Sequence, residues 1–502
     1  MSERKKTAFL IWIFFFSLYI LTAKGFIKHF DGETMYQVTR SIVEDGRVSV
    51  EKEFAGRIMG SPGPDGNLYS KYEIGHSVAA VPLYMVGRAA ADVFPSLPRT
   101  LFTRFACSLL GQFATAAACA VIYLFCLDLG YGKRTSVFLA LLYGLGTMAW
   151  PYSKTFFREP VSAFLILSGA CCAYRYRLRG RLSTLFACGA FLGGALLERQ
   201  DGALAIAVIG VYVACASHRD GRAARRFFSF LAPVAAAAAV NLAYNWARYG
   251  SIWITGYEGQ DIDTGFSTPF FVGLYGLLLS SGKSVFIYSP VLVLFLPSIF
   301  FFFAGHRKEA LLFVSLIAVY TCFYARWGYW HGGWCWGPRF MLQVVPFALI
   351  PVGSLLRRRN SAPVAAVLVM VIAASFAVQV LAVSVSEMRF LQAAMVPWEA
   401  DDPLFRPGRK VLHGDIIFDP AYFPLRAQWR SYLNCSWKKL SGDLRDPSVL
   451  EETSFRRELE RGPDVWWAYL YRLGLPPLLL LSVVPPLVVC AVSFLFLVRR
   501  TR

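Results

Sequence analysis

FDGETMYQVTRSIVEDG, residues 30–46, follows directly on the first apolar run of this chain of 502 residues. It holds four carboxylates: Asp31, Glu33, Glu44 and Asp45. Asp31 can cap a helix whose first turn holds Glu33, and Gly46 can end that helix. Because Met35 and several other apolar residues fall on one side of it, the stretch predicts an amphipathic helix on a membrane surface.

The chain around this stretch has the composition of a membrane protein. It is 56% hydrophobic, with a mean hydropathy of +0.47. Its apolar runs are about 20 residues long, which is the length that crosses a ~30 Å hydrocarbon layer. The strong runs lie near 7–23, 101–127, 135–150, 160–175, 183–197, 202–217, 227–246, 285–304, 310–326, 338–356, 363–386 and 474–498. They predict an all-α polytopic membrane protein.

The net charge is +19, from 51 basic and 32 acidic residues. Most of the excess lies in short loops, where basic residues set membrane topology, so it does not indicate nucleic-acid binding. A weaker run, 74–94, is interrupted by His76, Pro82 and Arg88. If it crossed the membrane, the basic loops from Lys133 onward would move outside. We therefore predict about 12 spans, both termini cytoplasmic, and a re-entrant or surface helix over 74–94.

The N-terminal segment fits an uncleaved anchor in the cell (inner) membrane. MSERKK at residues 1–6 precedes the first run and favours an N-terminus on the inside. LTA at residues 21–23 is a passable cleavage site, so a removed signal peptide is the alternative.

The predicted topology brings polar regions together on the extracytoplasmic face. We expect four parts: a transmembrane module 1–250 with the outer first loop 24–100, a second transmembrane part 251–386 with outer loops 247–284 and 327–337, an outer polar segment 387–473, and a final helix with a basic cytoplasmic tail, 474–502.

Charged residues collect where these outer loops meet the spans. Lys71 begins the weak run, Glu159 precedes Pro160, and Arg199 lies at the end of a span. WGYWHGGWCWGPR adds His331 and Arg339. Acidic and basic groups at the outer ends of separate spans predict a polar pocket at the interface.

Each of these groups also has a simpler interpretation. Asp31 and Glu33 could be only capping residues that stabilise the N-terminal end of the helix. Lys71 could anchor to lipid phosphate without specificity. The aromatic residues of 327–337 fit a membrane-interface belt or a platform for sugar stacking. Cys335 and Cys435 would both lie outside, where a disulfide between them is possible.

The order of these motifs resembles that of the GT-C superfamily of integral membrane glycosyltransferases. The branch with protein O-mannosyltransferases and the lipid A aminoarabinose transferase is the most similar. FDGETMYQVTRSIVEDG resembles its acidic helix, NLYSKYEIGHSVAAVPLYMVG its lysine segment, and FFREP its second acidic position. RFACSLLGQFATAAACAVIYLFCLDLGYGKRTSVFLALLYG resembles its second and third spans, and WHGGWCWGPRFMLQVVPFALIP a late segment of bacterial members. The segment 387–473 shows no match.

The resemblance implies a GT-C-like fold and a membrane glycosyltransferase. Such an enzyme moves a sugar from a polyprenyl-monophosphate donor to an envelope glycan, lipid or protein. An inverting displacement needs one carboxylate base, and cations at headgroup depth stabilise the leaving phosphate. The residues expected to serve are catalytic Asp31, Glu33 and Glu159, phosphate-binding Lys71, Arg199 and Arg339, and, more weakly, substrate-binding Tyr36, Tyr72 and His331.

Two points stay open within the resemblance. When Tyr36 is matched to the family, Asp31 falls one residue early, so either Asp31 or Glu33 is the base. Ser70 occupies a place where some members carry a metal-ligating acid. A divalent metal is therefore possible but not required, and no other cofactor is implied.

Two other classes of protein remain. A transporter or flippase with 12 spans, moving a lipid-linked or anionic substrate, would share the basic inner loops, but it would more often have internal repeats and deep ionisable residues. An envelope polymer ligase or polymerase would not be expected to carry its acidic motif so early. The sequence does not identify the sugar or the acceptor.

Overall fold

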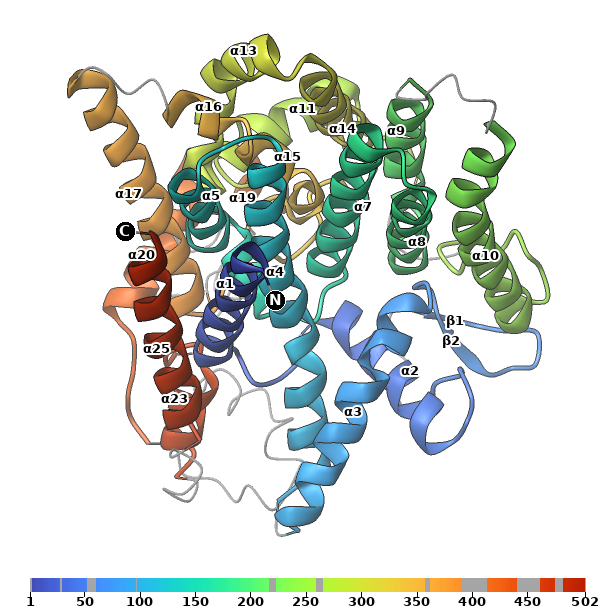
Figure 1. Cartoon of the computed structure of the whole chain (residues 1–502). Helices are drawn as coiled ribbons and strands as arrows, with labels where there is room; N and C mark the ends of the chain where they lie inside the picture. The colour runs from blue at the N-terminus through green and yellow to red at the C-terminus, as the bar shows by residue number, and fades with distance from the viewer. Residues whose placement is uncertain are drawn as a thin grey trace.

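The computed structural model describes residues 2–27, 29–51, 60–95, 97–215, 223–258, 265–356, 362–387, 389, 413–439, 461–474 and 482–501. Nearly all regular structure in these residues is helical, as predicted (Figure 1). The exception is an antiparallel ribbon of β1 (Gly60–Pro62) and β2 (Leu68–Ser70), paired Gly60 to Ser70.

Long helices fill most of the predicted apolar runs. They are α1 (Glu3–Leu21), α4 (Arg99–Asp128), α5 (Lys133–Gly146), α7 (Glu159–Arg179), α8 (Leu182–Glu198), α9 (Gly202–Cys215), α10 (Ala223–Tyr249), α14 (Arg307–Arg326), α17 (Ala362–Ser384) and α25 (Val484–Thr501). Among the described residues, α4, α10, α14 and α17 are long and apolar enough to cross a membrane. Shorter apolar helices such as α8 and α9 accompany them. The number of spans and the side of each terminus stay predictions.

Two expected spans are broken, and this corrects the prediction. Residues 285–304 form α12 (Val285–Tyr288), η2 (Pro290–Leu294) and most of α13 (Phe295–Gly305). Residues 338–356 form η3 (Arg339–Gln343), α15 (Val345–Leu349) and α16 (Val352–Leu356). Prolines explain the breaks, because each lacks a backbone N–H and clashes with the preceding turn. Pro290 starts η2, and Pro351 separates α15 from α16.

The helices pack through small residues in a core that joins both halves of the chain. α4 contacts α1, α5 and α7, while α8 lies between α7 and α10. A Cβ at Gly189 or Gly193 of α8 would collide with the backbone of Phe230 or Pro233 in α10. Glycine therefore permits this close approach, as is common between helices in membranes.

The opening stretch forms α2 (Phe30–Glu44), which begins two residues earlier than a cap at Asp31 requires. His29 is the N-cap, so Asp31 lies in the first turn, and its carboxylate bonds a distant arginine instead of the helix end. Gly46, at φ +64°, follows the helix end as predicted. Met35 and the apolar side of α2 are buried against protein, not lipid, because α3 (Gly75–Val93) covers it.

Helix α3 occupies the weak run 74–94, so the predicted helix is confirmed. It packs on α4 and α2, and its other side exposes Val78, Met85, Val86 and Val93. An apolar outer side fits a helix lying on lipid. Its placement at the membrane surface stays a prediction.

The described parts of the segment 387–473 are short helices, not a separate large domain. They are α19 (His413–Phe418), η4 (Pro420–Tyr422), α20 (Pro424–Leu433) and α23 (Trp466–Arg472). The indole N–H groups of Trp466 and Trp467 donate to the carbonyls of Ile20 and Leu21, at 2.8 and 2.9 Å. Helix α23 of this segment is therefore hydrogen-bonded to the C-terminal end of α1.

Candidate functional site

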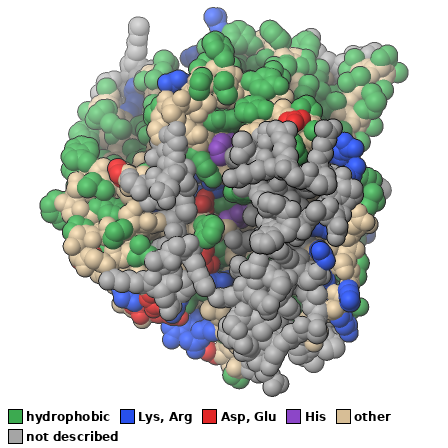
Figure 2. Space-filling view, turned by 180° about the vertical axis from the view of Figure 1, so that it is seen from behind, with side chains coloured by type: hydrophobic (Ala, Val, Ile, Leu, Met, Phe, Trp, Pro, Cys, Tyr) green, Lys and Arg blue, Asp and Glu red, His purple; other side chains and the backbone are tan. Residues whose placement is uncertain are grey.

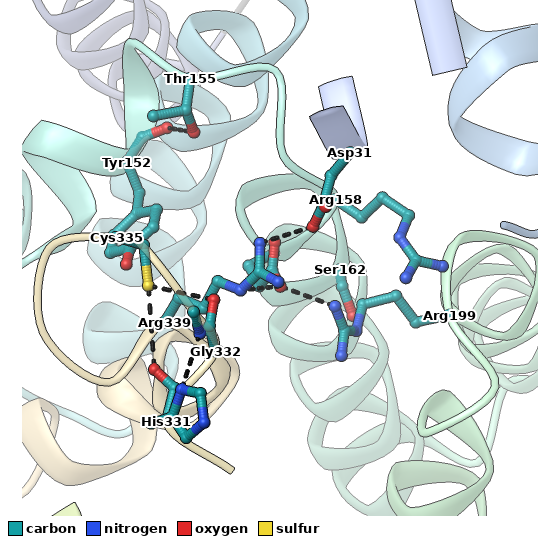
Figure 3. A network of polar contacts seen from close by, with 12 residues as sticks. Asp31, Tyr152, Thr155, Arg158, Ser162, Arg199, His331, Gly332, Cys335 and Arg339 are labelled. Atoms are coloured by element: carbon teal, nitrogen blue, oxygen red, sulfur yellow. Dashed lines mark hydrogen bonds and ion pairs between the residues drawn. The ribbon is translucent and has the colours of Figure 1, made fainter. Parts of the chain in front are cut away.

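Asp31 belongs to a cluster of charged residues contributed by distant parts of the chain (Figure 3). Its Oδ2 accepts a hydrogen bond from Nη1 of Arg339 at 2.7 Å, and Tyr72 hydrogen-bonds the same carboxylate. Burial alone would raise the pKa of Asp31, but the charges of Arg339 and Lys71 hold it well below its usual range. Asp31 is therefore ionised at neutral pH.

Asp31 is also the most accessible carboxylate of this cluster. Its side chain is 21% exposed, whereas those of Glu159, Asp201 and Glu73 are 2%, 5% and 5% exposed. Figure 2 shows acidic and histidine side chains gathered in a depression of the rear face. Asp31 is therefore the carboxylate of this cluster that is most open to a ligand.

A chain of ion pairs extends from Arg339 into the protein. Nε of Arg339 lies 3.8 Å from Oε1 of Glu159, which accepts from Nη1 of Arg199 at 2.7 Å. Arg199 also donates from Nε to Asp201 at 3.0 Å and from Nη2 to the hydroxyl of Tyr324 at 2.8 Å. These contacts engage every nitrogen of Arg199. The sequence predicted that Arg199 binds the donor phosphate. From these contacts we expect instead that Arg199 holds α7, α9 and α14 together.

Replacing Arg199 by Met is expected to destabilise the protein by about 3–5 kcal/mol, since it leaves buried carboxylates without their cation. Thermal unfolding in detergent measures this, with Arg179→Met, at an exposed arginine, as the matched control. Normal unfolding together with a raised KM for the donor would instead assign Arg199 to phosphate binding.

Lys71 differs from the arginines because its ammonium forms no ion pair within the described part of the chain. It is 5% exposed, yet no carboxylate of the described residues lies within 4.0 Å of Nζ. Nζ lies 5.2 and 5.5 Å from the ring centroids of Tyr257 and Tyr72. Burial and the charges of Arg158 and Arg339 lower the pKa of Lys71 to about 8, against the opposing effect of Asp31. This cation is available for an anionic ligand.

The backbone beside Lys71 is fixed by α10. The carbonyl of Ser70, the last residue of β2, accepts hydrogen bonds from the Arg248 guanidinium and from the Tyr249 hydroxyl, the latter at 3.0 Å. The ribbon and α10 thus hold Lys71 beside α2. Lys71 itself lies between β2 and α3, four residues before the first residue of α3.

Glu33 is not part of the same cluster. Its Oε1 accepts from Nη2 of Arg104 and from Nε2 of Gln37, both at 2.7 Å. Residues two apart on a helix point in different directions, so Asp31 and Glu33 cannot share one site. The structure brings together Asp31, Lys71, Tyr72, Glu159 and Arg339.

Tyr36 and His331 lie beside this cluster and not in it. Tyr36 is buried, and its hydroxyl lies 2.7 Å from Oγ1 of Thr103. His331 precedes two glycines with positive φ, and its Nδ1 accepts from the N–H of Gly333 at 3.0 Å (Figure 3).

Sequence reasoning missed Arg158 and Tyr257. Arg158 pairs with Glu73, donates to the Tyr257 hydroxyl at 3.1 Å, and lies 4.4 Å from the centroid of the Tyr72 ring. Its position beside Glu159 in FFREP could have indicated it. No signal marks Tyr257, which comes from the loop after α10.

The segment WGYWHGGWCWG is folded into the protein. Trp330 and Trp336 are only 5% and 6% exposed, so these two do not form a membrane-interface belt. Cys335 is free and buried, and Cys435 is also free, so the possible disulfide is not formed. Glycines with positive φ at 332, 333 and 337 let the chain turn tightly enough to bury these rings.

Lys283 fixes this loop from inside. Nζ donates to the carbonyls of Gly333, Cys335 and Gly337 at 3.0, 2.9 and 3.1 Å, and Lys283 is 5% exposed. Arg339 follows two residues after the last of these glycines. Lys283 therefore sets the position from which Arg339 reaches Asp31.

Replacing Lys283 by Met should loosen the 331–339 segment, because each buried carbonyl left unpaired costs about 1–3 kcal/mol. We expect faster amide exchange across this segment, measured by hydrogen–deuterium exchange and mass spectrometry. Lys308→Met, at an exposed lysine, is the control. Unchanged exchange in Lys283→Met would refute this role.

The described residues bring no three or more His, Cys, Asp or Glu side chains together in an arrangement that could hold a metal ion. At Ser70, the position raised by the resemblance, the backbone carbonyl is engaged by α10, and the hydroxyl accepts from the N–H of Tyr72 at 2.9 Å.

The fold is similar to that of the GT-C membrane glycosyltransferases, as the motif order predicted. Solved structures with a similar fold include ArnT from Cupriavidus metallidurans and the oligosaccharyltransferase of Archaeoglobus fulgidus. The apo form of ArnT matches with a TM-score of 0.51 and 15% identity, over 99% of this chain and 76% of that one. ArnT bound to undecaprenyl phosphate matches with a TM-score of 0.52 and 14% identity over the same shares.

The apo form of the Archaeoglobus fulgidus protein matches with a TM-score of 0.50 and 11% identity, over 80% of this chain and 58% of that one. No protein-family model and no curated protein matches the sequence. The likeness therefore establishes the fold.

Proposed function

We propose that this protein is a membrane glycosyltransferase that moves a sugar from a polyprenyl monophosphate to an envelope acceptor on the extracytoplasmic face. One observation carries the proposal: a partly exposed, ionised carboxylate, Asp31, lies beside a buried ammonium, Lys71, that forms no ion pair with any described residue. This pair offers a base for a hydroxyl and a cation for a leaving phosphate. ArnT, which shares the fold, binds undecaprenyl phosphate in one of its structures.

In the proposed reaction Asp31 takes the proton of the acceptor hydroxyl as the hydroxyl oxygen bonds the anomeric carbon. The bond from that carbon to the phosphate oxygen breaks at the same time, and the electron pair leaves with the phosphate. A single displacement inverts the anomeric centre and needs no protein nucleophile. Lys71 stabilises the charge that grows on the leaving phosphate, and Arg339 reinforces it.

Arg339 has a second task in this scheme. Its contact with Asp31 at 2.7 Å keeps the carboxylate ionised and pointed along one direction. Glu159 forms an ion pair with Arg339 and a closer one with Arg199. In this scheme Glu159 therefore orients Arg339 and does not act as the base.

The competing function is that of a transporter or flippase, and the fate of the carrier separates the two. Proteoliposomes would hold a polyprenyl-phosphate mannose labelled in both sugar and carrier, with an envelope extract outside. An enzyme separates the sugar label from the carrier label. If both labels cross the bilayer together and stay joined, transport is correct and the proposal fails.

A further inference from the structure

Arg158 contacts both aromatic rings that face Lys71. Its guanidinium lies 4.4 Å from the centroid of the Tyr72 ring, and its Nη2 donates to the Tyr257 hydroxyl at 3.1 Å. The Lys71 ammonium lies 5.5 Å from the first of these ring centroids and 5.2 Å from the second. One arginine thus fixes two rings from different parts of the chain, Tyr72 after β2 and Tyr257 after α10.

Arg158 is itself held firmly. It is 6% exposed, it forms an ion pair with Glu73, and its Nη1 donates to the carbonyl of Glu198 at 3.0 Å. It is also the N-cap residue of α7. A planar guanidinium can stack on one ring while its N–H groups bond other partners, which the single ammonium of a lysine cannot do.

The backbone of Lys71 is fixed separately from its side chain. Nη1 of Arg248 donates to the carbonyls of Ser70 and Tyr72, the latter at 3.3 Å. A Cβ on Gly256 would lie 3.0 Å from the Cα of Lys71, so the loop after α10 packs directly on this residue. Because the described residues offer the ammonium no ion pair, its two aromatic neighbours are what orient it.

Without these rings the ammonium would be drawn to the nearest carboxylate. Lysine carries a point charge on a flexible four-carbon stem, and the charge of Asp31 attracts it. An ion pair between Lys71 and Asp31 would occupy the proposed base and neutralise the proposed phosphate-binding cation together. Cation–π contacts orient an ammonium without neutralising its charge, so the rings keep Lys71 available for an anionic ligand.

We infer that Arg158 is a positioning residue for the donor phosphate: by holding Tyr72 and Tyr257, it keeps the Lys71 ammonium from pairing with Asp31. This inference rests on the proposed function, in which Lys71 is the cation that binds the phosphate. Arg158 touches neither the sugar nor the phosphate, and its effect on the reaction passes through Lys71.

Arg158 also acts on Lys71 through its charge. Titratable and charged groups face Lys71 from several elements: Asp31 of α2, Tyr72 and Glu73 of its own segment, Arg158 before α7, Tyr257 after α10 and Arg339 of η3. The two arginines lower the pKa of Lys71, and the two carboxylates raise it. Like charges about 10 Å apart near a protein surface change a pKa by roughly one pH unit, and Lys71 and Arg158 lie 5.5 and 4.4 Å from one ring centroid.

The test measures phosphate binding and is therefore independent of sugar transfer. The probe is undecaprenyl phosphate, added to the full chain in nanodiscs, and its Kd is measured from about pH 7.5 to about pH 9.5, above the second pKa of a phosphate monoester. Arg158→Lys keeps the charge but cannot hold both rings, whereas Arg158→Gln removes the charge as well. Arg175→Lys is the matched control, because Arg175 is an ion-paired arginine at the other end of α7.

In Arg158→Lys we expect the Kd near neutral pH to rise roughly three- to tenfold, the loss expected from a cation–π contact. Its decline in binding should stay centred near pH 8, as in the wild type. In Arg158→Gln the centre of the decline should move up by roughly one pH unit. The control should change neither quantity. Binding by Arg158→Lys equal to that of Arg175→Lys would overturn the inference, as would a decline that stays near pH 8 in Arg158→Gln.

Arg158→Gln leaves Glu73 buried without its cation, so thermal unfolding is measured first. The double variant Arg158→Gln/Glu73→Gln replaces the ion pair by two neutral amides. Its decline should also move to higher pH, because Arg158 affects the pKa of Lys71 more than Glu73 does, and an unmoved decline would count against the inference. If these shifts occur and no donor yields transfer, the role of Arg158 stands and the transferase is refuted. Unchanged binding together with intact transfer would do the reverse.

Discussion

Asp31→Asn is expected to lower the rate of sugar transfer by roughly 10²–10⁴-fold, the usual contribution of a general base. Asparagine keeps the size of the side chain and a carbonyl oxygen to accept from Arg339, but it cannot take a proton. Donor binding should survive, because Lys71 and Arg339 remain. The measurement is single-turnover transfer by the purified variant, together with the affinity for undecaprenyl phosphate.

Glu33→Gln is the matched control for this prediction. It alters a carboxylate on the same turn of α2, bonded to Arg104 and Gln37 and not to the cluster around Asp31. We expect transfer within about twofold of the wild type, since exposed or partly exposed ion pairs contribute only ~0–1 kcal/mol. Loss of transfer in Glu33→Gln alone would move the base by two residues.

The second large effect concerns Lys71 and pH. The pKa of Lys71 is lowered to about 8 by burial and by the neighbouring arginines, so the ammonium is protonated below this pH and neutral above it. If Lys71 binds the donor phosphate, kcat/KM for the donor should fall as pH rises through about 8. The free-enzyme profile reports this group because kcat/KM follows the unliganded state.

Two substitutions at Lys71 separate its charge from its shape. Lys71→Met should lower donor affinity roughly 10- to 100-fold at neutral pH, since a hydrogen bond to a charged group is worth about 1.5–3 kcal/mol. Lys71→Arg keeps the charge at high pH and should abolish the decline above pH 8. A decline that persists in Lys71→Arg would have to come from another group.

Much of α2 was predictable from local sequence. The periodicity of residues 30–46 and the glycine at its end predict α2, and Lys71 was identified from its position before α3. The first residue of α2 was predicted wrongly, because the carboxylate of Asp31 satisfies Arg339, 308 residues away, and not its own helix. No local pattern contains that contact.

The role of Arg199 shows the same limit. A positive charge at the end of a predicted span is equally consistent with phosphate binding and with a structural ion pair. The choice depends on Glu159, Asp201 and Tyr324, whose meeting requires three helices to pack. Lys283 carries no local signal, because its partners are backbone carbonyls, which every residue has.

The broken helices could have been predicted. Runs 285–304 and 338–356 contain prolines within their apolar sequence, and hydropathy averaged over a window hides them. The length of these apolar runs indicated membrane spans, whereas their prolines indicated interruptions of the helix. The interruption before Pro346 leaves Arg339 on a short 3₁₀ turn beside Asp31.

The most direct test of the central claim follows the anomeric carbon. Purified protein in nanodiscs would receive a panel of polyprenyl-phosphate sugars of known configuration, each labelled with ¹³C at that carbon, with an envelope extract as acceptor. We predict transfer from one donor, one polyprenyl monophosphate released for each sugar moved, and inverted configuration in the product. A product with retained configuration, or label that stays on the carrier with every donor, would contradict the account.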